Sequence, residues 1–94
     1  MALYLISYDI NEKDAWEYGK LWDTLKQMGC AKILYSEWIT TGSDGAALTI
    51  YNRIAPCIQK KDRLLVQELG GNAAWDQVML TDDTFRKWIA HARI

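Results

Sequence analysis

The sequence predicts a single α+β domain in which elements follow the order strand, helix, two strands, helix, strand. Apolar residues alternate with a period of two at the start of the chain, and two later segments repeat them every three or four positions. Glycine-containing or charged breaks separate these segments. The resulting β-α-β-β-α-β order is the ferredoxin-like arrangement. Residues 1–94 fit one domain, with a core at about 2–70, a C-terminal extension and a short last helix.

Residues 2–10 form the first predicted strand, and it is apolar on both faces. Alternate side chains of a strand point to opposite sides of the sheet. One face therefore carries Tyr4, Ile6, Tyr8 and Ile10. The other carries Leu3, Leu5, Ser7 and Asp9. A chain of 94 residues has too few helices to cover both faces of a sheet, so we expect a homodimer in which the second faces pack against each other.

An amphipathic helix is predicted next. Its apolar residues recur at three- and four-residue spacing: Tyr18, Leu21, Trp22, Leu25 and Met28. The polar segment 11–14 supplies candidates for the N-cap of this helix, and Gly29 has the residue type favoured just beyond a helix C-terminus.

Residues 31–40 are rich in β-branched and aromatic residues, which indicates strand structure. Two interpretations fit this segment: one long strand, or two short strands bent near Ser36. Only the second completes the β-α-β-β-α-β order.

The second helix is predicted after a turn at 41–45. Its buried stripe comprises Ala47, Ile50, Tyr51, Ile54 and Ile58. Pro56 lies inside this pattern, and proline removes a backbone donor from a regular helix. We therefore expect the helix to kink at Pro56 or to end at Ala55. A charged connector, 59–62, leads into a last strand at 63–69.

The C-terminal tail begins at the break formed by Gly70, Gly71 and Asn72. We interpret the two glycines as a hinge that sends residues 71–94 across to the partner subunit. Thr81, Asp82 and Asp83 open a final helix, because acidic side chains suit the positive end of the helix dipole. Its apolar residues are Phe85, Trp88, Ile89 and Ala92.

Composition excludes several classes of function. The net charge of -1 is not that of a globally basic nucleic-acid binder. No apolar run approaches the ~18 residues of a membrane span, and no secretory signal is recognisable, so we expect a cytoplasmic protein without a membrane partner. Cys30 and Cys57 are then expected to be reduced thiols. His91 has no Cys or His at metal spacing, and no C-x-x-C motif or P-loop is present.

Asp9 is the candidate metal ligand and catalytic residue. It ends the first strand on the face expected at the dimer interface, so two Asp9 carboxylates would meet near the twofold axis. Mg²⁺ prefers oxygen ligands and is often held by one or two carboxylates together with substrate phosphates. Such a pair could hold Mg²⁺ or Mn²⁺ and activate a water. The alternative interpretation is that Asp9 closes a turn or caps the first helix.

Candidate nucleic-acid-binding residues lie near the last predicted strand. Lys60, Lys61 and Arg63 form the densest basic cluster of the chain. They could bind phosphates with salt-dependent affinity, and Ser36 could orient a water or phosphate near Asp9. The alternative is that the cluster is a solvated connector and Ser36 only a bend residue.

Three of these segments together resemble a known family. Tyr8-Asp9-Ile10 ending a first strand, Gly29 ending the first helix, and Ser36-Glu37-Trp38 entering the third strand are similar to the small CRISPR-associated adaptation proteins of the Cas-two superfamily. The segment 69–75, Leu-Gly-Gly-Asn-Ala-Ala-Trp, resembles a divergent branch labelled SinR family.

The resemblance implies a ferredoxin-like dimer with its sheets packed face to face. Some members of that superfamily are metal-dependent nucleases acting on RNA or DNA through the Asp of the first strand, and others are non-catalytic bridges that hold DNA. This chain departs from the pattern in two places. Residues 11–16 read Asn-Glu-Lys-Asp-Ala-Trp where the family usually has a basic residue early in the first helix, and apolar residues 33–35 replace the usual Arg or Gln.

Three functions remain open from the sequence. The first is a metal-dependent endonuclease that uses Asp9 from both subunits. The second is a non-catalytic dimeric module that binds a protein or nucleic acid. The third is a regulatory domain that binds a small ligand in the dimer groove.

Overall fold

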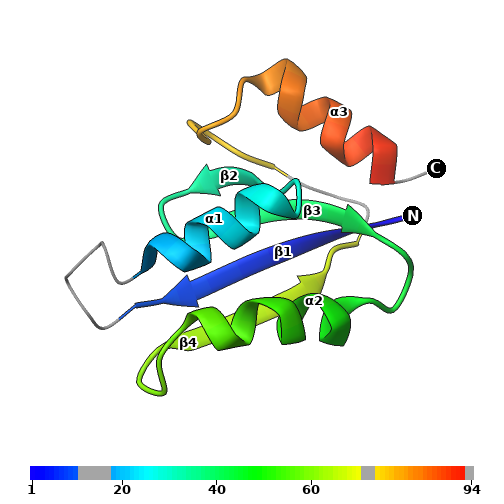
Figure 1. The fold of residues 1–94 in the computed structure, drawn as a ribbon. Coiled ribbons are helices and arrows are strands. Elements are labelled where there is room, and N and C mark those ends of the chain that lie inside the picture. The colour runs from blue at the N-terminus through cyan, green and yellow to red at the C-terminus, as the bar shows by residue number, and fades with distance from the viewer. Residues whose placement is uncertain (11–17, 71–73, 93–94) are drawn as a thin grey trace.

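The computed structural model describes residues 1–10, 18–70 and 74–92, and it is a small α+β domain (Figure 1). Along the chain, the described elements are the strand β1 (Ala2–Asp9), the helix α1 (Gly19–Gln27), the strands β2 (Ala31–Leu34) and β3 (Glu37–Gly42), the helix α2 (Ala47–Ile54), the 3₁₀ turn η2 (Ala55–Cys57), the strand β4 (Arg63–Glu68) and the helix α3 (Asp82–Ala92).

The described strands form one antiparallel sheet in the order β2-β3-β1-β4. This order and the sequence of elements are compatible with the ferredoxin-like arrangement. The segment 31–40 is two strands, as the second interpretation predicted, and the chain reverses between Leu34 and Glu37. The central strand β1 lies between β3 and β4, so its backbone is hydrogen-bonded along both edges.

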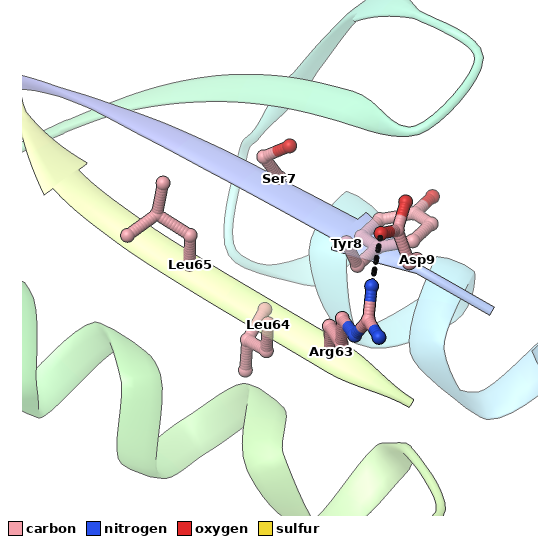
Figure 2. A pocket seen from close by; sticks show the side chains of 6 residues that line it. All are labelled: Ser7, Tyr8, Asp9, Arg63, Leu64 and Leu65. Carbon is pink, nitrogen blue, oxygen red and sulfur yellow. Dashed lines mark ion pairs between the residues drawn. The ribbon is translucent and has the colours of Figure 1, made fainter. Parts of the chain in front are cut away.

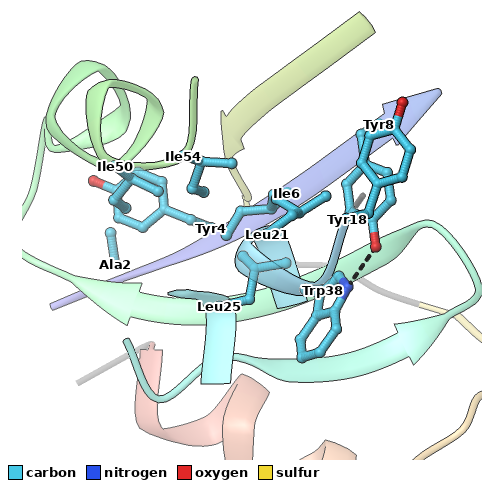
Figure 3. Packing of buried hydrophobic residues seen from close by; sticks show 10 residues of the cluster. All are labelled: Ala2, Tyr4, Ile6, Tyr8, Tyr18, Leu21, Leu25, Trp38, Ile50 and Ile54. Carbon is cyan, nitrogen blue, oxygen red and sulfur yellow. Dashed lines mark hydrogen bonds between the residues drawn. The ribbon is translucent and has the colours of Figure 1, made fainter. Parts of the chain in front are cut away.

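The first face of the sheet carries the main core, under α1 and α2 (Figure 3). The predicted alternation along β1 is confirmed, since Tyr4, Ile6 and Tyr8 are all buried on this face. The helices contribute only part of their predicted stripes, because Tyr51, expected in the buried stripe of the second helix, is 38% exposed. The buried residues of the two helices are Leu21, Leu25, Ile50 and Ile54. Burial of each such aliphatic side chain contributes about 1.5–3 kcal/mol.

The second face of the sheet is partly covered by the tail of the same chain, which corrects the expectation that the chain lacks an element for it. Phe85 of α3 is buried against Leu3, Ile33 and Ile39. The ring of Phe85 stacks on that of Trp75, with centroids 4.6 Å apart. The tail therefore buries apolar area on its own sheet. Contact of this tail with a partner subunit stays a prediction.

The helix boundaries follow local rules with small departures from expectation. Gly29, with φ +79°, adopts the left-handed conformation typical of the residue after a helix. The helix α2 ends at Ile54, one residue before the expected end, and Pro56 lies in η2. Ile58 consequently lies outside α2, although it still packs against the core. The predicted N-cap segment 11–14 lies outside the described residues.

A buried hydroxyl joins the start of α2 to the sheet. The Tyr4 hydroxyl lies 2.6 Å from the Ser43 carbonyl oxygen and 2.9 Å from Glu68 Oε1, and it accepts a bond from the Ala46 N–H at 2.8 Å. The Gly45 N–H also donates to Glu68 Oε1, at 3.1 Å. The loop before α2 is thus held to β1 and β4 at the end of the sheet away from Asp9.

Among the described residues, no helix is both long and apolar enough to cross a membrane. Cys30 and Cys57 are both free and half-buried.

Candidate functional site

Two of the sequence-predicted site residues, Asp9 and Arg63, lie at one end of the sheet, where β1 ends and β4 begins (Figure 2). Asp9 pairs directly with Arg63 in the antiparallel register of β1 and β4. On the other side of β1, the Tyr8 N–H donates to the Ser36 carbonyl at 3.1 Å. The structure therefore brings Asp9, Ser36 and Arg63 to the same end of three neighbouring strands.

Lys60 and Lys61 lie in the turn that leads into β4, so they reach this end of the sheet through the chain. The turn is ordered by Asp62, which accepts bonds from the Gln59 N–H and the Tyr18 hydroxyl. Both lysines are exposed. The positive charges near this end of the sheet thus come from Arg63 in β4 and from Lys60 and Lys61 in a turn whose backbone is held by Asp62.

Asp9 and Arg63 form an ion pair with Nη1 and Oδ2 3.8 Å apart. Their side chains are 73% and 84% exposed, respectively, so the pair is accessible to water. An exposed pair of this kind contributes only about 0–1 kcal/mol. A ligand can therefore separate the two groups at little cost, and each remains available for binding.

An open pocket of about 150 Å³ lies at this position. Its lining comprises Ser7, Tyr8, Asp9, Arg63, Leu64 and Leu65. Figure 2 shows the Asp9–Arg63 ion pair among these lining residues. The pocket is too small and open to enclose a typical small-molecule ligand, which needs about 300–1,000 Å³. It matches a surface contact with one anionic group.

The pocket continues into a part of the second face that the described tail leaves open. The register of β1 and β4 places five residues there, which we call the open strip: Ser7, Asp9, Arg63, Leu65 and Gln67. Leu65 is 52% exposed at its centre. A single exposed leucine is normal on a protein surface, so Leu65 is compatible with a protein–protein contact here without indicating one by itself.

Sequence reasoning missed a second carboxylate, Glu37. It pairs with Ser7 across β1 and β3, so it shares the face of Asp9 and lies diagonally from it. Diagonal neighbours of this kind are about 7–8 Å apart. The signal was present in the sequence, because Glu37 follows Ser36 directly. Only the strand register, however, shows that Glu37 and Asp9 face the same way.

The donor chemistry of Asp9 suits Mg²⁺ or Mn²⁺, which prefer carboxylate oxygens. Within the described part of the chain, no three His, Cys, Asp or Glu side chains lie close enough to hold a metal ion together. The described residues of one chain therefore offer an incomplete ligand set, and among them Asp9 would need a second carboxylate source or substrate phosphates. His91 lies in α3, outside this site.

No protein-family model matches the chain.

Proposed function

We propose that this protein is a Cas-two-like homodimer that cleaves phosphodiester bonds of RNA or DNA with Mg²⁺ or Mn²⁺. The observation that carries the proposal is the exposed Asp9 at the end of β1, on the open strip, with Arg63 directly opposite. A carboxylate beside a guanidinium provides a cation ligand and an anion ligand in one place.

The homodimer would form through the open strips of two chains. The partner would exclude water from Leu65. Because Leu65 is 52% exposed in one chain, its burial would contribute about half of the 1.5–3 kcal/mol of a fully exposed leucine. A twofold axis near β1 would bring the two Asp9 side chains together, because a symmetric interface uses the same patch of both subunits. The two carboxylates would add to the ligand set that the described residues of one chain leave incomplete.

Some residues of the site would bind the metal ion and others the phosphates of the substrate. The two Asp9 carboxylates would hold the metal, which when bound supplies activation of a water and polarisation of the phosphate. Arg63 would bind a phosphate oxygen beside it, in the bidentate geometry typical of arginine. Lys60 and Lys61 would bind neighbouring phosphates of the strand, and Ser36 would contact the phosphate from the β3 side.

A cleavage assay tests the activity. Labelled single-stranded RNA and double-stranded DNA are incubated with Mg²⁺, with Mn²⁺ or with EDTA. We expect metal-dependent cutting by the wild type, its loss in Asp9→Asn, and its retention in Asp23→Asn, an exposed carboxylate on α1 that serves as the matched control. Cutting that persists in Asp9→Asn or in EDTA contradicts the proposal.

Sizing by light scattering tests the dimer separately. Leu65→Lys is expected to give monomers, because two lysines would face each other across the axis. Leu48→Lys changes a leucine that is 69% exposed on α2 and should leave the dimer intact. A monomeric wild type, or a dimeric Leu65→Lys chain, contradicts this interface.

The second candidate is a non-catalytic dimeric module that binds a protein or nucleic acid. The ion pair of Asp9 with Arg63 favours it, because the guanidinium already neutralises the carboxylate that would otherwise attract a metal ion. This module predicts binding without cutting, and binding that survives Asp9→Asn. A cytoplasmic location is proposed for either protein, and two unpaired thiols are compatible with it.

A further inference from the structure

A second pocket lies on the opposite face of the sheet from Asp9. It has a volume of about 260 Å³ and is lined by Trp22, Lys26, Lys32 and Trp38. The first two residues belong to α1, Lys32 to β2 and Trp38 to β3. Lys32 and Trp38 are direct partners in the sheet register. Two aromatic and two cationic side chains, from three elements, therefore converge at one place.

The two indole rings are held in position by one hydroxyl. The Trp22 and Trp38 Nε1–H groups both donate to the Tyr8 hydroxyl, at 3.3 Å and 3.0 Å; the dashed line in Figure 3 marks the bond from Trp38. Because both N–H groups are already bonded, a ligand can contact the indoles only through ring faces and carbon edges. Trp22 is half-buried and is the ring that can stack on a ligand, whereas Trp38 is only 4% exposed and shares the Tyr8 hydroxyl with Trp22.

Lys26 and Lys32 bring positive charge to the pocket. Within residues 1–10, 18–70 and 74–92, neither ammonium forms an ion pair. The Lys32 ammonium lies 5.7 Å from the centre of the Tyr35 ring and 5.9 Å from that of Trp38. This cation–π contact holds the charge beside the pocket but leaves its N–H donors available for an anion.

We propose that this pocket binds a nucleoside phosphate, either free or as one nucleotide of a single strand. Aromatic faces stack on any nucleobase, and lysines next to them bind the attached phosphate. The volume is below the range of about 300–1,000 Å³ typical of sites that enclose a whole small molecule. It therefore matches one base and one phosphate, and excludes a dinucleotide cofactor.

The indole N–H signals of Trp22 and Trp38 in ¹⁵N-correlated NMR spectra report on binding. They are assigned from Trp22→Phe and Trp38→Phe chains. The probes are adenosine 5′-monophosphate, adenosine, inorganic phosphate and a five-nucleotide single strand. We expect the monophosphate to shift both signals. Adenosine and phosphate should each bind with at least about tenfold lower affinity, because each makes only part of the contacts of the monophosphate.

Two substitutions separate binding from folding. Lys32→Gln should weaken binding of the monophosphate by at least about tenfold, the loss expected for one charged contact. Lys20→Gln, on the exposed side of α1, should leave this binding unchanged. Trp22→Leu keeps apolar volume but removes the ring, so it should abolish the preference for the monophosphate over phosphate. Thermal melts show whether each variant is folded.

The five-nucleotide strand distinguishes the two sources of the ligand. Tighter binding of the strand than of the monophosphate assigns the site to single-stranded nucleic acid, and equal binding assigns it to free nucleotide. The proposal is overturned if no probe shifts either indole signal at millimolar concentration, or if Lys20→Gln and Lys32→Gln weaken binding equally. Asp9→Asn should leave these shifts intact, so the pocket and the proposed nuclease can fail independently.

Discussion

Replacement of Phe85 by alanine tests how the tail is bound. Phe85 is 7% exposed, stacks on Trp75 and packs against the second face of the sheet. Truncation of a buried phenylalanine typically costs about 3–5 kcal/mol. A domain of this size has an expected stability of about 5–14 kcal/mol. The substitution should therefore remove a large part of the free energy of unfolding. The loss cannot exceed the free energy with which the tail binds the sheet, because a detached tail no longer depends on Phe85.

Urea denaturation followed by tryptophan fluorescence measures this effect. At a slope of about 1.5 kcal/mol/M, a loss of about 3 kcal/mol lowers the midpoint by about 2 M. Lys87→Ala, at an exposed position of the same helix, should change stability by no more than about 0.5 kcal/mol. Both substitutions are made in the Leu65→Lys chain, so that the proposed dimer does not contribute.

Two results would refute the reasoning. A change below about 1 kcal/mol for Phe85→Ala would mean that the tail adds little to the fold of its own chain. A midpoint that still rises with protein concentration in the Leu65→Lys background would mean that the tail docks on a partner subunit, because stability that depends on association follows mass action.

Three further predictions concern single groups. Thr81 caps α3 by accepting a bond from the Thr84 N–H at 3.2 Å, so Thr81→Ala should cost about 1 kcal/mol in urea denaturation. The bond from the Gly45 N–H, followed by that of the Tyr4 hydroxyl, lowers the pKa of Glu68 from its ordinary 4.5. Its carboxylate therefore adds stability above pH 4.5 that is lost as pH falls through the lowered pKa, and acid titration of Glu68→Gln should lack this loss. Burial raises the pKa of the Cys30 thiol above 9.0. In a Cys57→Ser chain, Cys30 should react with a disulfide reagent at pH 8 much more slowly when folded than when unfolded in urea.

The faces of the elements could be predicted from local patterns. The alternation along β1 assigned Tyr4, Ile6 and Tyr8 to one face, and the structure buries all three. Helix stripes behave in the same way, since side chains three or four residues apart share a face whatever the rest of the chain does. The cap at Thr81 also depends only on its neighbours.

The composition of the candidate site could be predicted only in part. Asp9 and Arg63 were each chosen for their chemistry, but no local pattern pairs them, because the register of β1 with β4 joins distant parts of the chain. Glu37 was missed for the same reason, because only the register of β3 with β1 shows that it lies on the face of Asp9. The pocket of Trp22 and Lys32 was missed because a helical stripe gives no hint of which strand residues it meets.

The sequence by itself determined which side chains share a face and where the last helix begins, because those properties depend on residues a few positions apart. It left residues 31–40 open between one strand and two, and strand pairing decided for two. Only the tertiary structure decided that the tail covers part of the second face, that Arg63 lies beside Asp9, and that two tryptophans meet two lysines on the opposite face. These arrangements depend on hydrogen bonds and apolar contacts between distant segments, and their energies are set by the packing of the whole domain.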